Sequence, residues 1–297
     1  MTRTVGLHPD FAEPLPTGLT HVRIWDAGAA WCQIHTAPGV YDWGRLDELV
    51  AKSQGKHVTY VISGCPRWAA KYPDQPHAAP WLGPGTNSVP FDLRIFYDFV
   101  GLLASRYKGK IQAYEVWNEP QLVDFLYPYT TAQCNALALM TERAYGIVKA
   151  ADPAAFVLAA SVLPRRSSGG MRRARRYLRA LRRRDWPVDA MTCHIYPEVG
   201  RGARRWAWML RRTVAQMRRL GAPSRLWITE TTYGLLGPVI PEDKARQLVA
   251  DTYAAAGGRF LYWYAANRPD LGGLQVVTTV GTQSAAWLTA TNERTKQ

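Results

Sequence analysis

Residues 113–120 read Ala-Tyr-Glu-Val-Trp-Asn-Glu-Pro, and this stretch says more about the fold than any other part of the sequence. Tyr, Val and Trp are frequent in β-strands, so residues 113–117 are predicted to form one. The polar side chains of Asn118 and Glu119 follow where that strand should end. Residues 226–231, Leu-Trp-Ile-Thr-Glu-Thr, show the same pattern of strand-forming residues with a glutamate at the end. They place Glu230 at the end of a second predicted strand.

Similar short runs of β-branched and aromatic residues recur along the chain and alternate with longer segments of helical periodicity. The predicted strands are residues 4–8, 21–26, 57–63, 113–117, 156–160, 190–194, 226–229 and 260–264. The predicted helices are residues 45–54, 93–107, 132–151, 171–184, 202–220, 241–256 and 283–294. Eight βα units predict an α/β protein with a closed (β/α)8 TIM barrel, rather than an open doubly wound sheet.

The connection at residues 9–20 departs from this pattern, because it holds three prolines and little helical periodicity. The first helix of the barrel is therefore predicted to be vestigial, or a single turn at most. A length of 297 residues would suit one barrel or two ordinary domains. Because no low-complexity linker or longer repeat interrupts the βα pattern, we expect residues 1–297 to form a single catalytic domain.

Glu119 and Glu230 are the leading candidates for chemistry. Catalytic residues of (β/α)8 barrels lie at the C-terminal ends of the strands, so both carboxyl groups should face one mouth. Glycoside hydrolysis needs such a pair, one protonated to release the leaving oxygen and one ionised. In an enzyme that retains anomeric configuration the two carboxyl groups lie roughly 5 to 5.5 Å apart.

Motifs along nearly the whole chain carry a resemblance to a known group of enzymes. They are Val5-Gly6-Leu7-His8, Val22-Arg23-Ile24, the stretch 31–43 with Pro38-Gly39-Val40-Tyr41-Asp42-Trp43, Cys65-Pro66-Arg67-Trp68-Ala69, Trp117-Asn118-Glu119-Pro120, His194-Ile195-Tyr196, Ile228-Thr229-Glu230 and Trp263. In order and spacing they resemble clan A glycoside hydrolases, and within that clan most closely family 39. The resemblance implies a retaining mechanism without metal or organic cofactor, with the acid/base after the fourth strand and the nucleophile after the seventh.

The resemblance assigns the acid/base role to Glu119 and the nucleophile role to Glu230. Glu119 would need a raised pKa, which a mouth lined by Trp117 could supply by desolvation, and Trp117 is also assigned to the substrate-binding residues. Asn118 would hydrogen-bond the sugar 2-hydroxyl. Glu115 is expected to stay outside the chemistry, as a residue of the barrel interior or of an ion pair.

Five further residues complete the implied substrate site. Arg23 and Tyr196 would donate hydrogen bonds to Glu230 and keep it charged, while His194 would orient the acid/base or bind a hydroxyl. Trp68 and Trp263 would be stacking platforms for sugar rings. Each has a structural alternative: Arg23 could pair with a structural acid, His194 could be a core histidine, and either tryptophan could serve packing alone.

The composition is that of an ordinary soluble globular protein, with 47% apolar and 20% charged residues. The 12 Trp and 15 Tyr could serve a core or a sugar-binding cleft. Four widely spaced cysteines, Cys32, Cys65, Cys134 and Cys193, predict free thiols, with one disulfide left open. The sequence as written shows neither a signal peptide nor a membrane-spanning apolar run, which predicts an unexported protein, or a trimmed or phage-derived form of an extracellular one.

Positive charge is concentrated in one segment. Residues 165–219 hold 17 arginines but only Asp185, Asp189 and Glu198, so this segment alone accounts for the net charge of +14. In both predicted helices of the segment, apolar residues repeat on one face and arginines fill the rest. The basic surface from Arg165 to Arg219 is either a solvated outer face or a surface that docks an anionic polymer, such as a cell-wall or capsule glycan.

Two other functions stay open from sequence. The chain could be a non-catalytic carbohydrate-binding barrel, such as an adhesion module, which would keep an aromatic cleft without chemistry. It could also bind nucleic acid through the arginines, although no recognised nucleic-acid motif accompanies them. The leading hypothesis is a retaining glycosidase that cleaves a poly- or oligosaccharide, with endo action on an anionic glycan as the more specific form.

Overall fold

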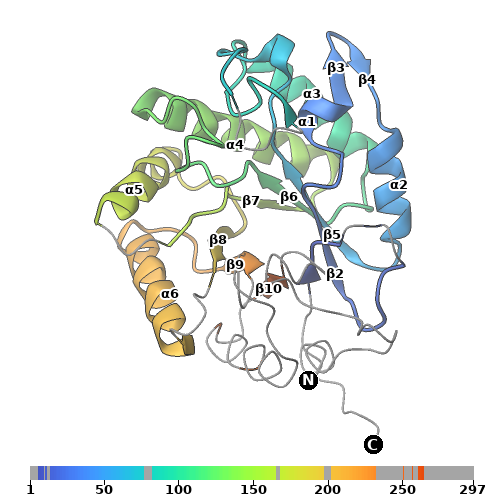
Figure 1. Ribbon diagram of the computed structural model, residues 1–297. Helices are drawn as coiled ribbons and strands as arrows, with labels where there is room; N and C mark the ends of the chain where they lie inside the picture. Colours follow the sequence, from blue (N-terminus) through green and yellow to red (C-terminus); the bar gives the residue numbers. More distant parts are fainter. Residues whose placement is uncertain are drawn as a thin grey trace, which may run out of the picture.

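The computed structural model describes residues 6–9, 11, 14–76, 82–164, 168–196, 202–231, 250, 256 and 260–263. Its main feature is an eight-stranded sheet in which all the pairings between neighbouring strands are parallel (Figure 1). The strands are β1 (Gly6–Leu7), β2 (His21–Ile24), β5 (His57–Ile62), β6 (Ala113–Val116), β7 (Phe156–Leu158), β8 (Met191–Ile195), β9 (Leu226–Thr231) and β10 (Phe260–Trp263). Each of the eight predicted strands is present, with ends shifted by a few residues.

The strand order closes the sheet on itself. The order is β7-β6-β5-β2-β1-β10-β9-β8, so consecutive strands are neighbours and the first pairs with the last. The two outer strands, β7 and β8, are joined by parallel bridges between Leu158 and Ala190 and between Val162 and Cys193. These contacts complete the ring, and the predicted (β/α)8 barrel is confirmed.

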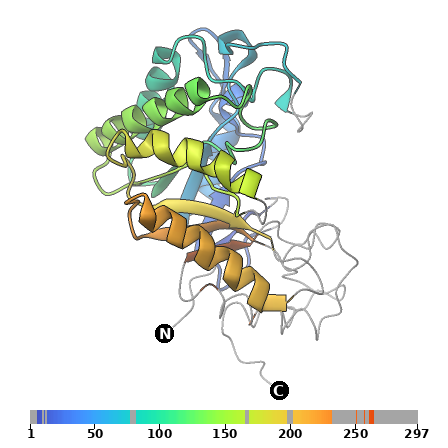
Figure 2. The same ribbon diagram turned by 90° about the vertical axis from the view of Figure 1, so that its left-hand side faces the viewer.

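Helices cover the outside of the sheet (Figure 1). They are α2 (Gly44–Lys52), α3 (Arg94–Arg106), α4 (Thr131–Ala151), α5 (Ser168–Arg182) and α6 (Gly202–Arg219). Figure 2 shows α4, α5 and α6 side by side on one flank of the molecule. The predicted helices at 241–256 and 283–294 fall almost wholly outside the described residues.

Helix α5 shows why these segments form outer helices. Its apolar residues Met171, Ala174, Tyr177, Leu178 and Leu181 are all buried, as their helical spacing predicts. The arginines between them are exposed. The apolar stripe therefore packs on the barrel and the rest of the helix faces solvent.

The first connection and the second differ from regular βα units. Among the described residues between β1 and β2 there is no helix, which agrees with the predicted vestigial first helix. After β2 the chain forms a short helix α1 (Trp31–Ile34) and a hairpin of β3 (His35–Ala37) and β4 (Val40–Tyr41), none of which was predicted. Pro38 and Gly39 make the turn, and Gly39 has a φ of 73° that suits glycine.

Two further features that the sequence raised are the state of the cysteines and the hydropathy of the helices. Cys32, Cys65, Cys134 and Cys193 are all free. None of the helices among the described residues is both long enough and apolar enough to cross a membrane.

Candidate active site

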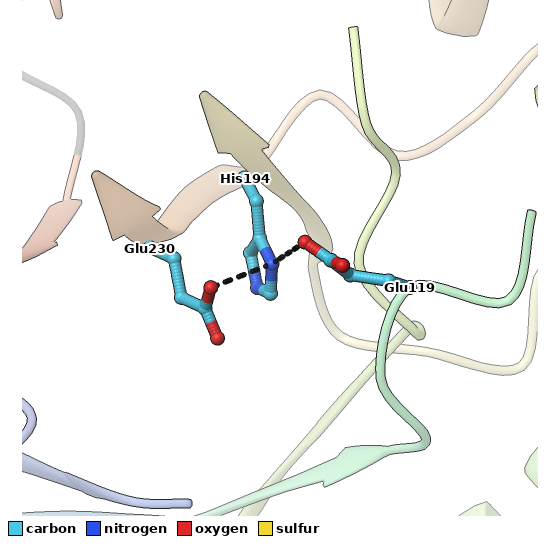
Figure 3. A group of neighbouring side chains, drawn as sticks. All are labelled: Glu119, His194 and Glu230. Atoms are coloured by element: carbon cyan, nitrogen blue, oxygen red, sulfur yellow. Dashed lines mark hydrogen bonds and ion pairs between the residues drawn. The ribbon is translucent and has the colours of Figure 1, made fainter. Parts of the chain in front are cut away.

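Glu119, His194 and Glu230 converge at the end of the barrel where the strands terminate (Figure 3). Glu119 follows β6, while His194 and Glu230 lie in the adjacent strands β8 and β9. Nδ1 of His194 is 2.7 Å from Oε1 of Glu119 and 3.2 Å from Oε2 of Glu230. One side-chain atom from each of the three residues lies within 4.8 Å of the other two. The two predicted carboxylates therefore share one mouth.

The backbone after β6 is bent to aim Glu119 into this cluster. Trp117 and Glu119 have positive φ values of 78° and 39°, which side-chain-bearing residues rarely adopt. The backbone N–H of Glu119 donates to Oγ of Ser161 at 3.0 Å, which helps to hold the bend. Such conformations cluster at functional sites, because only a well-packed surrounding structure can maintain them.

Arg23 connects most of the polar groups of the mouth. Its Nε donates to Oε2 of Glu115 at 2.7 Å, and its Nη1 donates to Oε1 of Glu230 at 2.6 Å. Its Nη2 donates to Oδ1 of Asn118 at 3.2 Å. The side chain is fully buried, and burial alone would lower its pKa. The carboxylates of Glu115 and Glu230 outweigh burial and raise the pKa of Arg23, so it stays charged.

The surroundings of Glu230 contain opposing influences on its charge. Arg23 and the Tyr196 hydroxyl both donate to its carboxylate, as the sequence predicted. Burial nevertheless raises the pKa of Glu230 above its ordinary value, although His194 and Arg23 act in the opposite direction. The two donors therefore limit the upward shift in pKa rather than reverse it.

His194 is a neutral hydrogen-bonding group at neutral pH, because burial lowers its pKa to about 4. Its Nε2 lies 3.1 Å from Oγ1 of Thr229 and 3.4 Å from Nη2 of Arg23. Its Nδ1 faces Glu119 and Glu230. Of the two roles predicted for His194, the geometry matches contact with the acid/base candidate.

The three tryptophans predicted for the substrate site lie in different surroundings. The Trp117 side chain is fully buried and donates from Nε1 to the carbonyl of Phe125 at 2.6 Å. Its prediction as a substrate-binding residue is corrected, because a ring enclosed in the core offers no face to a sugar. Trp68 is half-buried and lines a cavity of about 660 Å³ together with Cys32 and Pro66. Trp263 belongs to β10, but its side chain lies outside the described residues.

Two residues that were not predicted to bind substrate or catalyse the reaction also contact Arg23. Glu115 is fully buried and accepts from Arg23, Thr192 and Thr229, so the expected ion-paired position is confirmed. His8 lies with its Nε2 3.2 Å from Nη1 of Arg23. The signal for His8 was its place as the last residue of the first predicted strand, at the end of the barrel where Glu119 and Glu230 were also expected.

Glu119, His194 and Glu230 could also offer ligand atoms to a metal ion. The guanidinium of Arg23 is 2.6 Å from the Glu230 carboxylate and already neutralises part of its charge. A divalent cation at this point would have to overcome repulsion by Arg23. The arrangement therefore suits proton transfer and carbohydrate chemistry better than metal binding.

The sequence matches no protein-family model and no curated protein. Solved structures do match its fold. A glucosidase from Croceicoccus marinus is 16% identical, with a TM-score of 0.72 over 97% of this chain. A GH39 β-xylosidase from Caulobacter crescentus is 19% identical (TM-score 0.68, 92% of this chain), and a GH10 endoxylanase from a sugarcane soil metagenome is 13% identical (TM-score 0.64, 98% of this chain).

The chain covers 66% of the glucosidase and 63% of the β-xylosidase, just under two thirds of each, but 96% of the endoxylanase. At these identities the match concerns the fold. The chain therefore has the fold of family 39 and family 10 glycoside hydrolases, as its motifs predicted for clan A and for family 39 in particular.

Proposed function

We propose that this protein is a retaining glycoside hydrolase that cleaves an oligo- or polysaccharide by double displacement. The observation that carries the proposal is the convergence of Glu119 and Glu230 at one end of the barrel, with side-chain oxygens within 4.8 Å of each other. This separation matches retaining enzymes, whose carboxyl groups lie roughly 5 to 5.5 Å apart. Inverting enzymes need a wider gap, which leaves room for a water molecule.

In the first step Glu119 gives its proton to the leaving glycosidic oxygen while a carboxylate oxygen of Glu230 bonds to the anomeric carbon. In the second step Glu119 takes a proton from water, whose oxygen displaces Glu230 from the same carbon. At the end of the cycle Glu119 is protonated and Glu230 is ionised again, while the glycosidic bond has been replaced by a bond to the oxygen of water. Nδ1 of His194 lies within hydrogen-bond distance of both carboxyl groups and helps to hold them in place.

Arg23 and Tyr196 prepare the nucleophile. Both donate to Glu230, and this counters the rise in pKa that burial causes. The amide oxygen of Asn118 accepts from Arg23, so the amide NH₂ is the group that can meet a sugar hydroxyl. This agrees with the predicted contact between Asn118 and the 2-hydroxyl. We also propose that Trp68 and Trp263 are stacking platforms for sugar rings. The proposed substrate is an anionic glycan, which the enzyme would cleave at internal bonds.

The test is a screen of aryl glycosides, in both anomeric configurations, and of bacterial and plant glycans. On any substrate found, Glu230→Gln should lower kcat by at least about a thousandfold, because no covalent intermediate can form. Glu48→Gln, which removes an exposed carboxylate that pairs with Arg45 on α2, is the matched control and should keep native activity.

A 2-deoxy-2-fluoro glycoside separates catalysis from mere sugar binding. It should label Glu230 of the native protein, which mass spectrometry of the digested chain would locate. A non-catalytic carbohydrate-binding barrel would bind the sugar without labelling. Near-normal hydrolysis by Glu230→Gln would remove the nucleophile assignment.

A further inference from the structure

A cavity of about 500 Å³ lies at the surface where α4 and α5 run side by side. Its lining, which we term the arginine groove, consists of Thr131, Arg172, Arg175, Arg176, Arg179 and Arg183. The volume falls within the range of ligand-binding sites. Five guanidinium groups around one depression make an anion the natural occupant.

The positive charge of the arginine groove is not balanced locally. The α5 sequence contains no acidic residue. Arg176 and Arg183 are held by uncharged acceptors, the carbonyl of Tyr129 and the side-chain oxygen of Asn135. Arg172, Arg175 and Arg179 are exposed, and within the described part of the chain none of them forms an ion pair. Thr131 begins α4, a helix of 21 residues whose N-terminus adds partial positive charge.

The arginine groove adjoins the loop that carries Glu119. Nη1 of Arg173 donates to the carbonyl of Gln121, two residues after Glu119, and Tyr129 in the same loop donates to the carbonyl of Arg173. Helices α4 and α5 both begin at the end of the barrel where their preceding strands finish, which is the catalytic end of this fold. A strand of polymer could therefore reach from the mouth onto this flank.

We propose that the arginine groove binds the anionic substituents, carboxylate or phosphate, of a polysaccharide strand that enters the catalytic mouth. This inference rests on the proposed function and specifies its substrate class. The planar guanidinium fork matches both oxyanions and suits repeated contacts along a charged glycan. Nucleic acid fits less well, because the lining residues include no aromatic side chain on which a base could stack.

Binding of fluorescent polygalacturonate to the intact protein, measured by anisotropy at low salt, tests this proposal. Arg172→Glu/Arg175→Glu/Arg179→Glu should weaken binding by about tenfold, because each exposed contact contributes about twofold. The matched control, Arg211→Glu/Arg218→Glu/Arg219→Glu, makes the same change in net charge on α6, outside the groove. It should weaken binding by less than about threefold. If the first variant does not unfold like the native protein, the corresponding glutamine variant replaces it.

Two further probes identify the occupant. The fully methyl-esterified polymer, which has the same backbone without charge, should not bind measurably. A single-stranded DNA oligonucleotide should bind more weakly than polygalacturonate at the same salt concentration. Equal losses in the two triple variants, binding of the neutral polymer, or tighter binding of DNA that depends on the same arginines would each overturn the proposal.

The groove and the catalytic proposal can fail separately. The binding measurement requires no turnover, so it reports on the groove whether or not the protein hydrolyses a glycan. If the protein binds polygalacturonate through the arginine groove but the fluoro-sugar never labels it, only the proposed hydrolase activity is contradicted. If the fluoro-sugar labels Glu230 but the triple variant of α5 binds polygalacturonate as the native protein does, only the proposed role of the arginine groove is contradicted.

Discussion

Arginine occupies two contrasting regions of this molecule, the mouth of the barrel and the outer face of α5. Arg23 in the mouth has no exposed surface and forms ion pairs of 2.7 Å with Glu115 and 2.6 Å with Glu230. Arg179 on α5 is exposed, and no ion pair involves it among the described residues. The same side chain thus depends on its protein partners in one region and on water in the other.

The difference shows where each arginine contributes to the protein. A buried guanidinium loses its hydration and is tolerated only with well-placed carboxylates, so removing it leaves uncompensated charges. An exposed guanidinium keeps its hydration and contributes little to the free energy of unfolding. In the mouth, Arg23 therefore contributes to stability as well as to the proposed chemistry, whereas the arginines of α5 are available for a binding partner.

Of all the substitutions proposed in these two regions, removal of Arg23 should lower the free energy of unfolding the most. Arg23→Met would leave Glu115 and Glu230 buried without their counter-charge, and should lower the free energy of unfolding by about 3 to 5 kcal/mol. Urea unfolding followed by tryptophan fluorescence measures this. A loss below about 1 kcal/mol would mean that the network contributes little to stability.

Two variants test the cause of that loss. Arg23→Lys keeps the charge but not the fork, so its loss should be intermediate. Arg23→Met combined with Glu115→Gln should recover part of the stability, because one of the unpaired charges is gone. A double variant no more stable than Arg23→Met would contradict the assignment to unpaired charge.

His194 should make stability depend on pH in the acid range. In the unfolded chain it binds a proton near pH 6.5, but in the folded protein only near pH 4. Between these values the unfolded state binds more protons, so the free energy of unfolding falls as pH falls. The contribution is roughly 3 kcal/mol across the window and should be absent from His194→Gln.

Urea unfolding at several pH values compares the native protein with His194→Gln. Burial also lowers the pKa of His8, which gives a slope of the same sign in both proteins. Glu230, with its raised pKa, gives a slope of the opposite sign in both. The difference between the two proteins reports the titration of His194 together with its effect on the pKa values of His8 and Glu230, and parallel pH curves from 6.5 to 4 would refute its buried neutral state.

The smallest effects should come from the outer face. Arg179→Gln should change the free energy of unfolding by no more than about 0.5 kcal/mol. Arg184→Gln removes an ion pair with Glu142 and should cost slightly more, up to about 1 kcal/mol. Urea unfolding of both variants gives the free energies of unfolding to compare with those of the Arg23 variants. A loss above about 2 kcal/mol in either one would show that this face contributes to the core as well.

Much of the fold could be read from local patterns. All eight strands lie where runs of β-branched and aromatic residues predicted them, because burial on a parallel sheet selects such residues. The position of Glu119 after β6, and of Glu230 near the C-terminal end of β9, was enough to predict that they meet. The hairpin of β3 and β4 was missed, although Pro38-Gly39 is a known turn signal.

Other features of the site depend on contacts that local patterns do not contain. The pattern around Trp117 does not reveal that the backbone turns its ring into the core, with positive φ at Trp117 and Glu119. It also does not reveal that Glu115 pairs with Arg23, from which it is separated by 92 positions. The charge count marked residues 165–219 as basic, but not which arginines gather around one cavity.

The sequence by itself determined the succession of βα units, the carboxylates at two strand ends and the arginine-rich outer faces. These follow from periodicity and composition, which are local properties of the chain. The tertiary structure alone decided which side chains share a hydrogen bond, how burial shifts the pKa of His194 and Glu230, and where the arginines of α5 meet α4. Such properties arise when closure of the sheet removes distant groups from water together.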